Sequence, residues 1–360
     1  MKPLYKIIIF LFILPTLAFS DVDTKYKHEK SKTISREYAV DADAIVRLKN
    51  KYGNMNITTW SKNKVEIDVK ITVKGNDLDD VENQLEDITV SFDSGASFVD
   101  AETIIESQKS NWNWWGKSKN LNYKIDYIVR MPTSNKVDLN NRYGNIYLDK
   151  ISGKSTINCD YGKINIGELN NDSNYINLDY CSTSTIGYAK NADINIDYSK
   201  LSIEKSESIK VNADYSTFNG GEIKNINFNT DYGSIRLEDV ENVEGNGDYT
   251  GIKLGKVRKN LNLDSDYGSI SIEELVKGFE QVVISAKYAG VRIGSNDDNN
   301  FNFEIDLQYG SFKRDKDLVD VFKSEEKSTK KYYEGVFGKG SKTSTVNIKS
   351  KYGSVTIQEN

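Results

Sequence analysis

The chain of 360 residues has little histidine, cysteine or proline, and the shortage of histidine bears directly on function. Its single histidine, His28, lies in a polar segment near the N-terminus. A mechanism that needs a buried histidine base, a histidine metal cage or a Ser-His-Asp triad therefore lacks its main component. We expect a protein that is not an enzyme, with no catalytic residue, no metal ligand and no cofactor.

Apolar runs of membrane-spanning length are absent beyond the first twenty residues. Those residues, MKPLYKIIIFLFILPTLAFS, place Lys2 and Lys6 before an apolar stretch, Ile7–Leu14, and end in a small-x-small pattern. This arrangement predicts a secretory signal peptide over residues 1–20, because a spanning helix needs about 20 apolar residues. The mature chain is then exported to the periplasm, the outer-membrane surface or the extracellular space, with no transmembrane span.

An excess of positive charge is also absent. Without Lys2 and Lys6, the 48 lysines and arginines fall to 46 against 53 acidic residues, and the net charge falls from −5 to −7. Nucleic-acid-binding domains carry a basic surface that neutralises phosphates. We therefore expect no nucleic-acid partner.

What the chain does contain is a short repeat built around Asp-Tyr-Gly. DYGSI occurs at Asp231–Ile235 and again at Asp266–Ile270. Consecutive copies between Tyr143 and Tyr309 are 17 to 21 residues apart, a period typical of a solenoid. The gap of 43 residues before the last copy fits two coils, one of them degenerate. The repeat tyrosines are Tyr52, Tyr143, Tyr161, Tyr180, Tyr198, Tyr215, Tyr232, Tyr249, Tyr267, Tyr288, Tyr309 and Tyr352.

Each copy predicts a corner between two strands. In INFNTDYGSIRL, Ile226, Phe228 and Tyr232 share one parity, whereas Ile235 and Leu237 have the other. Because side chains alternate along a strand, the apolar face stays inward only if the chain bends after the tyrosine. We therefore expect an all-β fold, a parallel β-solenoid of about 17–21 residues per coil, with coils about 4.8 Å apart.

The same parity predicts where the repeat tyrosines and their neighbours lie. It favours an internal ladder of packed rings over the alternative, an exposed aromatic column that binds a glycan or a flat ligand. The residue after the tyrosine is always small, and Thr250 occupies it once, so close packing rather than a positive φ explains the glycines.

Seven consecutive copies carry an aspartate just before the tyrosine, and parity directs these side chains outward in a column. Carboxylates about 4.8 Å apart repel each other by roughly 1 kcal/mol in water. Either they cap turn amides with screening by lysines such as Lys163, Lys200 and Lys253, or they bind Ca²⁺. The glycine-rich nonapeptide of calcium-binding solenoids is absent, which favours capping. The column consists of Asp160, Asp179, Asp197, Asp214, Asp231, Asp248 and Asp266.

The two cysteines lie in neighbouring copies of the repeat. Cys159 has the parity of an inward residue, and Cys181 follows Tyr180 at the corner. In register they are expected three residues apart along the strand direction, about 10 Å, which is beyond the reach of a disulfide.

Residues 21–135 differ from the regular repeats at 136–360 and predict a β-rich N-terminal cap that includes the first coil at Tyr52. Long alternating strands are expected at 64–73 and 121–131, and the apolar spacing of LDDVENQLEDI predicts a helix near 78–88. Such a cap covers strands that would otherwise pair with another chain. A second insertion, Lys323–Gly335, is rich in charge and is expected to be a solvated loop.

The segment Asn111–Asn120 contains three of the four tryptophans, Trp112, Trp114 and Trp115. Exposed tryptophans in a secreted protein suggest a patch that stacks on a glycan or docks a protein. The alternative is a loop that folds back and buries them over the cap. These three residues are the sequence's best candidate for a partner-binding site.

The signal peptide, LKNKYGNMNITTW at Leu48–Trp60, IVRMPTSNKVDLNNRYGNIYL at Ile128–Leu148 and the repeats that follow resemble a family of exported bacterial β-strand-repeat proteins. The family is called putative adhesins, is treated as a domain of unknown function and is common in Bacteroidota. The resemblance implies a right-handed parallel β-solenoid in the cell envelope and carries over no catalytic residue.

The leading hypothesis is a secreted, non-enzymatic scaffold that binds a glycan, an envelope polymer or a protein. A periplasmic partner of a membrane signalling or stress system is an alternative. A β-helix carbohydrate-active enzyme is less favoured, because the coils from Tyr143 to Tyr267 are uniform and their charged positions repeat rather than converge.

Overall fold

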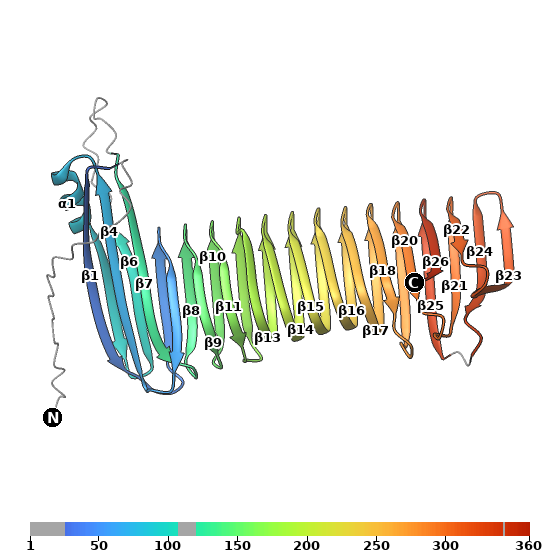
Figure 1. Ribbon diagram of the computed structural model, residues 1–360, viewed down its shortest axis with the longest axis horizontal. Helices are drawn as coiled ribbons and strands as arrows, with labels where there is room; N and C mark the ends of the chain where they lie inside the picture. The colour runs from blue at the N-terminus through green and yellow to red at the C-terminus, as the bar shows by residue number, and fades with distance from the viewer. Residues whose placement is uncertain (1–25, 107–119, 341–342) are drawn as a thin grey trace.

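The computed structural model describes residues 26–106, 120–340 and 343–360, which form an elongated rod made almost entirely of β-strands (Figure 1). The expectation of an all-β fold is confirmed. The predicted signal peptide at residues 1–20 and the three tryptophans at 112, 114 and 115 lie outside the described residues.

The middle of the rod is a stack of coils, each paired in parallel with the next coil along the chain. In β14 and β15, for example, Val211 pairs with Phe228 and Leu201 with Phe218, seventeen residues apart. The strands of the stack are β8 (Lys136–Arg142), β9 (Ile146–Ile151), β10 (Ser155–Asp160), β11 (Ile164–Leu169), β12 (Asn174–Asp179), β13 (Thr183–Asp197), β14 (Lys200–Asp214), β15 (Thr217–Asp231), β16 (Ser234–Asp248), β17 (Gly251–Asp266), β18 (Ser269–Leu275), β19 (Gln281–Lys287) and β20 (Gly290–Ser295).

Each coil has two sides with a thin apolar core between them. The segment before a repeat tyrosine forms the pre-tyrosine face, and the segment after it forms the post-tyrosine face. In β14 these are Ser208–Asp214 and Lys200–Ser206, joined by a bend. Alternation sends Leu201 and Ile203 inward from one face and Ile209 and Val211 inward from the other, and all four are buried.

The prediction that the repeat tyrosines fill the core is wrong. All twelve are 38–53% exposed, and each has a positive φ, between 47° and 63°. The alternation rule holds only for extended residues, and a residue in the left-handed region interrupts it. The ring therefore turns out of the corner, although the residue two positions earlier points inward.

Small residues follow the tyrosines because consecutive corners are in near contact. A Cβ atom on Gly233 would lie 2.3 Å from the carbonyl oxygen of Ser216, and one on Gly268 would lie 2.1 Å from that of Thr250. Where serine replaces glycine, its hydroxyl forms a hydrogen bond to the neighbouring coil: Ser216 Oγ donates to the carbonyl of Ile196 at 2.9 Å. The expectation of close packing agrees with these contacts, and the positive φ belongs to the tyrosine.

The cysteines lie much closer together than the predicted 10 Å. Cys181 Sγ donates to the carbonyl oxygen of Cys159 at 3.0 Å, and both thiols are free and buried. The left-handed Tyr180 turns the chain inward, which places Cys181 over the preceding coil.

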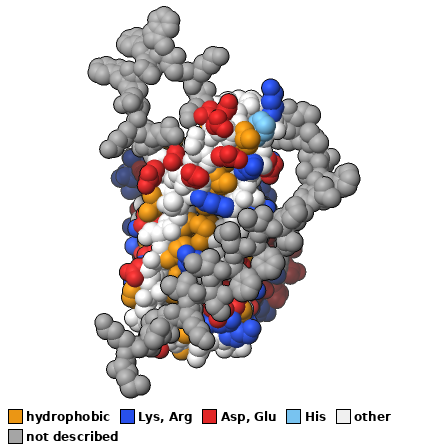
Figure 2. Space-filling model, turned by 90° about the vertical axis from the view of Figure 1, so that its left-hand side faces the viewer, with side chains coloured by type: hydrophobic (Ala, Val, Ile, Leu, Met, Phe, Trp, Pro, Cys, Tyr) orange, Lys and Arg blue, Asp and Glu red, His pale blue; other side chains and the backbone are white. Residues whose placement is uncertain are grey.

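At the N-terminal end, β2 and β3 form the expected first coil at Tyr52, paired in parallel with β8 and β9, and the strands beyond it form a mixed sheet. β4 lies between β1 and β7 and is antiparallel to both, and α1 (Leu78–Asp87) is capped by Asp77, whose side chain accepts from the amide of Asp80. Figure 2 looks onto this end, where hydrophobic side chains remain visible between acidic and basic ones. The strands here are β1 (His28–Ala39), β2 (Ile45–Lys51), β3 (Met55–Trp60), β4 (Lys64–Gly75), β5 (Ile88–Gly95), β6 (Phe98–Ile105) and β7 (Asn122–Pro132).

At the C-terminal end the last coil is inserted between two earlier ones. β25 pairs in parallel with β19 on one side and β21 on the other, and β26 lies between β20 and β22 in the same way. The strands are β21 (Phe301–Gln308), β22 (Ser311–Arg314), β23 (Val319–Lys327), β24 (Lys330–Phe337), β25 (Ser344–Lys351) and β26 (Ser354–Glu359).

Two predictions for this region are therefore wrong. The 43 residues between Tyr309 and Tyr352 do not hold two coils, and the charged segment Lys323–Gly335, although mostly exposed to solvent as expected, is not a loop. β23 and β24 form an antiparallel hairpin that pairs with β21 and ends the stack. Val319 and Phe337, which flank the charged segment, are buried at the base of the hairpin beside β21.

Candidate functional site: a polar groove along the rod

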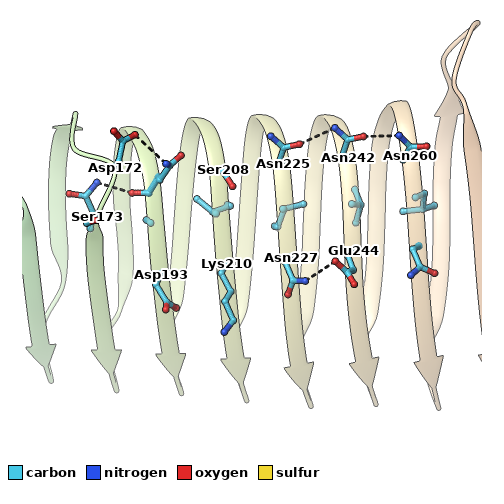
Figure 3. Close-up of a pocket in the computed structure, with 18 of the residues that line it drawn as sticks. Asp172, Ser173, Asp193, Ser208, Lys210, Asn225, Asn227, Asn242, Glu244 and Asn260 are labelled. Atoms are coloured by element: carbon cyan, nitrogen blue, oxygen red, sulfur yellow. Dashed lines mark hydrogen bonds between the residues drawn. The ribbon is translucent and has the colours of Figure 1, made fainter.

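A groove of about 1090 Å³ runs along the pre-tyrosine face of the stack (Figure 3). It crosses seven neighbouring strands, β12 to β17 and β19, so its long axis follows the axis of the rod. Its lining residues include Asp172, Ser173, Tyr175, Asn191, Asp193, Ser208, Lys210, Asn225, Asn227, Asn242, Glu244, Asn260, Asn262, Gln281 and Val283.

One row of the lining is a ladder of asparagines at the bend between the two faces. Asn242 Nδ2 donates to Asn225 Oδ1 at 2.9 Å, and Asn260 Nδ2 donates to Asn242 Oδ1 at 3.0 Å (Figure 3). Nearer β12, Asn191 Nδ2 donates to Asp172 Oδ1 at 3.2 Å. These bonds between coils hold the amides in fixed orientations along the groove.

The second row lies two residues further along each strand, in the lower half of Figure 3. Asn227 Nδ2 donates to a carboxylate oxygen of Glu244 at 3.1 Å. Within the part of the chain that the structure describes, the side chains of Asp193, Lys210 and Asn262 make no hydrogen bond or ion pair. These three polar groups are available to a ligand without breaking a contact inside the protein.

The repeat tyrosines form a continuous ladder on the outside of the corners. Neighbouring rings are stacked with centroids 4.6–5.1 Å apart and planes within 21° of parallel, from Tyr52 at one end to Tyr309 at the other. Tyr352 fills the place between Tyr288 and Tyr309. Because each ring face is covered by its neighbour, a sugar cannot stack along the ladder, and the tyrosines stabilise the rod instead.

The aspartate column runs beside this ladder in exact strand register. It begins next to Arg142, whose Nε lies 4.0 Å from Asp160, and ends at Lys287, whose Nζ lies 3.4 Å from Asp266. The prediction that these carboxylates cap turn amides is wrong: over the described ranges, no hydrogen bond joins one of them to a turn amide. Among the residues that the structure describes, there is also no group of three or more His, Cys, Asp or Glu side chains that could hold a metal ion.

The crowding of this column predicts an unusual pH dependence of stability. Burial, together with repulsion from the neighbouring aspartates, raises the pKa of Asp197 and of Asp231. A raised pKa means that the folded state binds protons more tightly than the unfolded chain, whose aspartates titrate near pH 3.9. The stabilising contribution is therefore present below that pH and is lost as the pH rises through the folded-state pKa.

We expect the double variant Asp197→Asn/Asp231→Asn to melt at a higher temperature than the wild type at pH 7, with the difference shrinking towards pH 4. Thermal denaturation at both pH values measures it. High salt serves as the control, because it screens repulsion between exposed carboxylates and should reduce the difference at pH 7. An equal difference at the two pH values would contradict this account.

Of the site residues predicted from sequence, the structure describes the tyrosines but not the tryptophans. The tyrosines come together in one ladder, but on the surface, and the tryptophan patch stays a prediction. The groove was missed, although a signal for it exists: asparagines recur ten or eleven residues after Tyr180, Tyr215, Tyr232 and Tyr249.

No family model matches the chain, and no curated protein does. Among solved structures, it is similar to a putative adhesin from Parabacteroides distasonis at 10% identity, covering 91% of this chain and 97% of that one, with a TM-score of 0.32. A putative adhesin from Parabacteroides merdae matches at 12% identity, 74% and 92% coverage and a TM-score of 0.30. A putative lipid binding protein from Parabacteroides distasonis matches at 8% identity, 90% and 96% coverage and a TM-score of 0.30. Likenesses of this size do not establish what the chain binds.

Across residues 26–106, 120–340 and 343–360, no helix has the length and apolar character needed to cross a membrane.

Proposed function

We propose that the chain is an exported, non-enzymatic, adhesin-like β-solenoid scaffold that binds an extended partner along its rod. The partner classes are a glycan, an envelope polymer or a protein. The observation that carries the proposal is the groove on the pre-tyrosine face, because it crosses seven coils in one direction. A channel of this shape matches a linear partner better than a compact metabolite.

The rigidity of the rod supports the same function. Parallel pairing joins each coil to the next, and the stacked tyrosines tie the corners together over the whole length. A surface built this way keeps its side chains in place before a partner arrives, which lowers the entropic cost of binding.

A carbohydrate-cleaving enzyme fits the groove less well. Asp193 and Glu244 occupy equivalent positions of strands separated by three coil steps, which is about 14 Å. Paired carboxylates that cleave glycosidic bonds lie about 5–9.5 Å apart. A role beside a membrane signalling system remains the alternative within the binding class, and it uses the same groove.

The proposal is tested with two variants in one strand, β15. Asn227→Trp fills the groove, whereas Asn219→Trp lies on the post-tyrosine face, and each change removes one side-chain hydrogen bond. Labelled wild type and variants are applied to arrays of glycans, purified envelope polymers and extracellular proteins. We expect Asn227→Trp to lose at least about tenfold in binding, which is about 1.4 kcal/mol, while Asn219→Trp binds like the wild type.

Circular dichroism of both variants tests whether the fold is retained. Equal binding by all three proteins would remove the groove as the site. Binding outside the groove would leave the predicted tryptophan patch as the remaining candidate.

A further inference from the structure

We infer that the occupant of the groove is a neutral, linear glycan chain lying parallel to the rod axis. This inference rests on the proposed function, since it names the class of partner that the same groove takes. Three properties of the lining carry it: the chemistry of its side chains, the absence of a free strand edge, and its charge.

Side-chain amides are the commonest polar groups of the lining, eight of its 22 residues, and each presents a donor and an acceptor side by side. Adjacent hydroxyls of a sugar ring also act as donor and acceptor, so an amide can bond to a pair of them. Asn225, Asn242 and Asn260 supply such groups on three consecutive coils. The side chains of Lys210 and Asn262, which have no partner among the described residues, add a donor and a further amide.

An extended polypeptide is less well suited to this surface. Peptides usually bind β-structure by adding a strand to an open edge, where unpaired backbone groups are available. The groove instead lies on the face of a sheet whose strands already pair on both sides, as β14 does with β13 and β15. Side chains alone are left for recognition, and the lining residues of the second row offer one aromatic ring, that of Tyr175.

A polyanionic polymer is disfavoured by charge. The lining carries the carboxylates of Asp172, Asp193 and Glu244 against the ammonium groups of Lys154 and Lys210. The aspartate column runs parallel to the groove four residues further along each strand, about 13 Å away. At low salt this distance lies within the reach of electrostatic repulsion, which physiological salt weakens.

The length of the groove adds a quantitative expectation. Its seven strands span six coil steps, about 29 Å in total. One coil step is close to the length of one pyranose unit in an extended chain, so each added sugar reaches the side chains of one further coil, which differ from coil to coil. Affinity should therefore rise with chain length and level off near six units.

Isothermal titration of the full mature chain tests the inference. The probes are unbranched neutral oligosaccharides of glucose, N-acetylglucosamine and mannose, in a length series from disaccharide to octasaccharide. A hexamer of galacturonic acid is the anionic counterpart, and an extended polar peptide is the protein counterpart. We expect at least one neutral series to bind with the length dependence above, and the anionic hexamer to bind weakly, most weakly at low salt.

Asn262→Leu is the test variant, and Asn165→Leu, on the exposed post-tyrosine face, is its matched control; neither asparagine side chain has a hydrogen-bond partner among the described residues. We expect Asn262→Leu to weaken binding about fivefold, the effect of one hydrogen bond, and Asn165→Leu to leave it unchanged.

The outcomes separate the two levels of the argument. Preference for the anionic hexamer or the peptide, with binding blocked by Asn227→Trp, overturns the neutral glycan but keeps the proposed function. If neutral glycans bind the Asn262→Leu and Asn227→Trp variants with the affinity of the wild type, the assignment of the groove is overturned. If no probe and no array ligand responds to Asn227→Trp, the proposed function fails as well.

Discussion

An aspartate in place of Ile348 is expected to release the C-terminal coil from the rod. Ile348 lies at the centre of β25, paired with Ile284 of β19 on one side and Ile305 of β21 on the other, and it is fully buried. A carboxylate there is desolvated without a partner, so the variant should lose about 4 kcal/mol or more of unfolding free energy.

The inserted position of β25 makes the consequence specific. When a terminal strand at the edge of a sheet detaches, one neighbour loses its hydrogen bonds. When β25 and β26 detach, the four strands β19, β20, β21 and β22 lose the hydrogen bonds that they made to them. Hydrogen exchange should therefore accelerate not only in residues 344–359 but also in 281–295 and 301–314.

Asn347→Asp is the matched control, because it adds the same charge at the adjacent, partly exposed position of β25. It should change the unfolding free energy little. Faster exchange confined to residues 344–359 in the Ile348→Asp protein would contradict the inserted arrangement. Size-exclusion chromatography is a second readout, since the opened edges of the stack are expected to associate.

Removal of one ring from the tyrosine ladder is expected to have the second largest effect. Tyr232 stacks on Tyr215 at 5.0 Å and on Tyr249 at 4.8 Å, with planes within 4° of parallel. Each such pair contributes about 0.5–1.5 kcal/mol beyond its buried area. Tyr232→Ala should therefore lower the unfolding free energy by about 1–3 kcal/mol, measured by chemical denaturation.

Two companion variants separate the ring from the backbone. Tyr232→Phe keeps both stacks and should be close to neutral. Tyr232→Gly loses the stacks but adopts the left-handed conformation, with φ of 54° here, at no steric cost, so it should be about 1 kcal/mol more stable than Tyr232→Ala. If Phe were as damaging as Ala, the hydroxyl rather than the ring would hold the ladder. Near-ultraviolet circular dichroism, which reports on coupled tyrosines, should fall for Ala and Gly and persist for Phe.

Much of the local structure of this protein can be read from its sequence. The apolar spacing at 78–88 predicts a helix, and α1 spans Leu78–Asp87 because Asp77 caps its first turn. The change of parity between Tyr232 and Ile235 predicts a bend, and β15 ends at Asp231 for that reason. Both features depend on residues a few positions apart, so a linear pattern contains the information needed.

The direction of the tyrosine rings was not predictable in the same way. Parity assumes that every residue up to the bend is extended, and it directs Tyr232 inward with Phe228. The bend is made by the tyrosine itself, in a left-handed conformation that non-glycine residues rarely adopt. The stacking of each ring on the rings of neighbouring coils offsets this cost, and those neighbours come into contact only after the coils assemble.

The groove and the C-terminal insertion were likewise decided by tertiary structure. The recurrence of asparagine is visible in the sequence, but its exposure and its alignment depend on where each coil bends between its two faces. The placement of β25 between β19 and β21 joins segments that are not neighbours in the chain, and the repeat pattern permits β25 at the end of the stack equally well. The sequence by itself determined the period of the coil, its corners and its inward face, because these follow from local alternation. Three features were decided only when distant segments packed together. They are the side of the corner on which the tyrosines lie, the order of the last coils, and the groove that crosses seven coils of the rod.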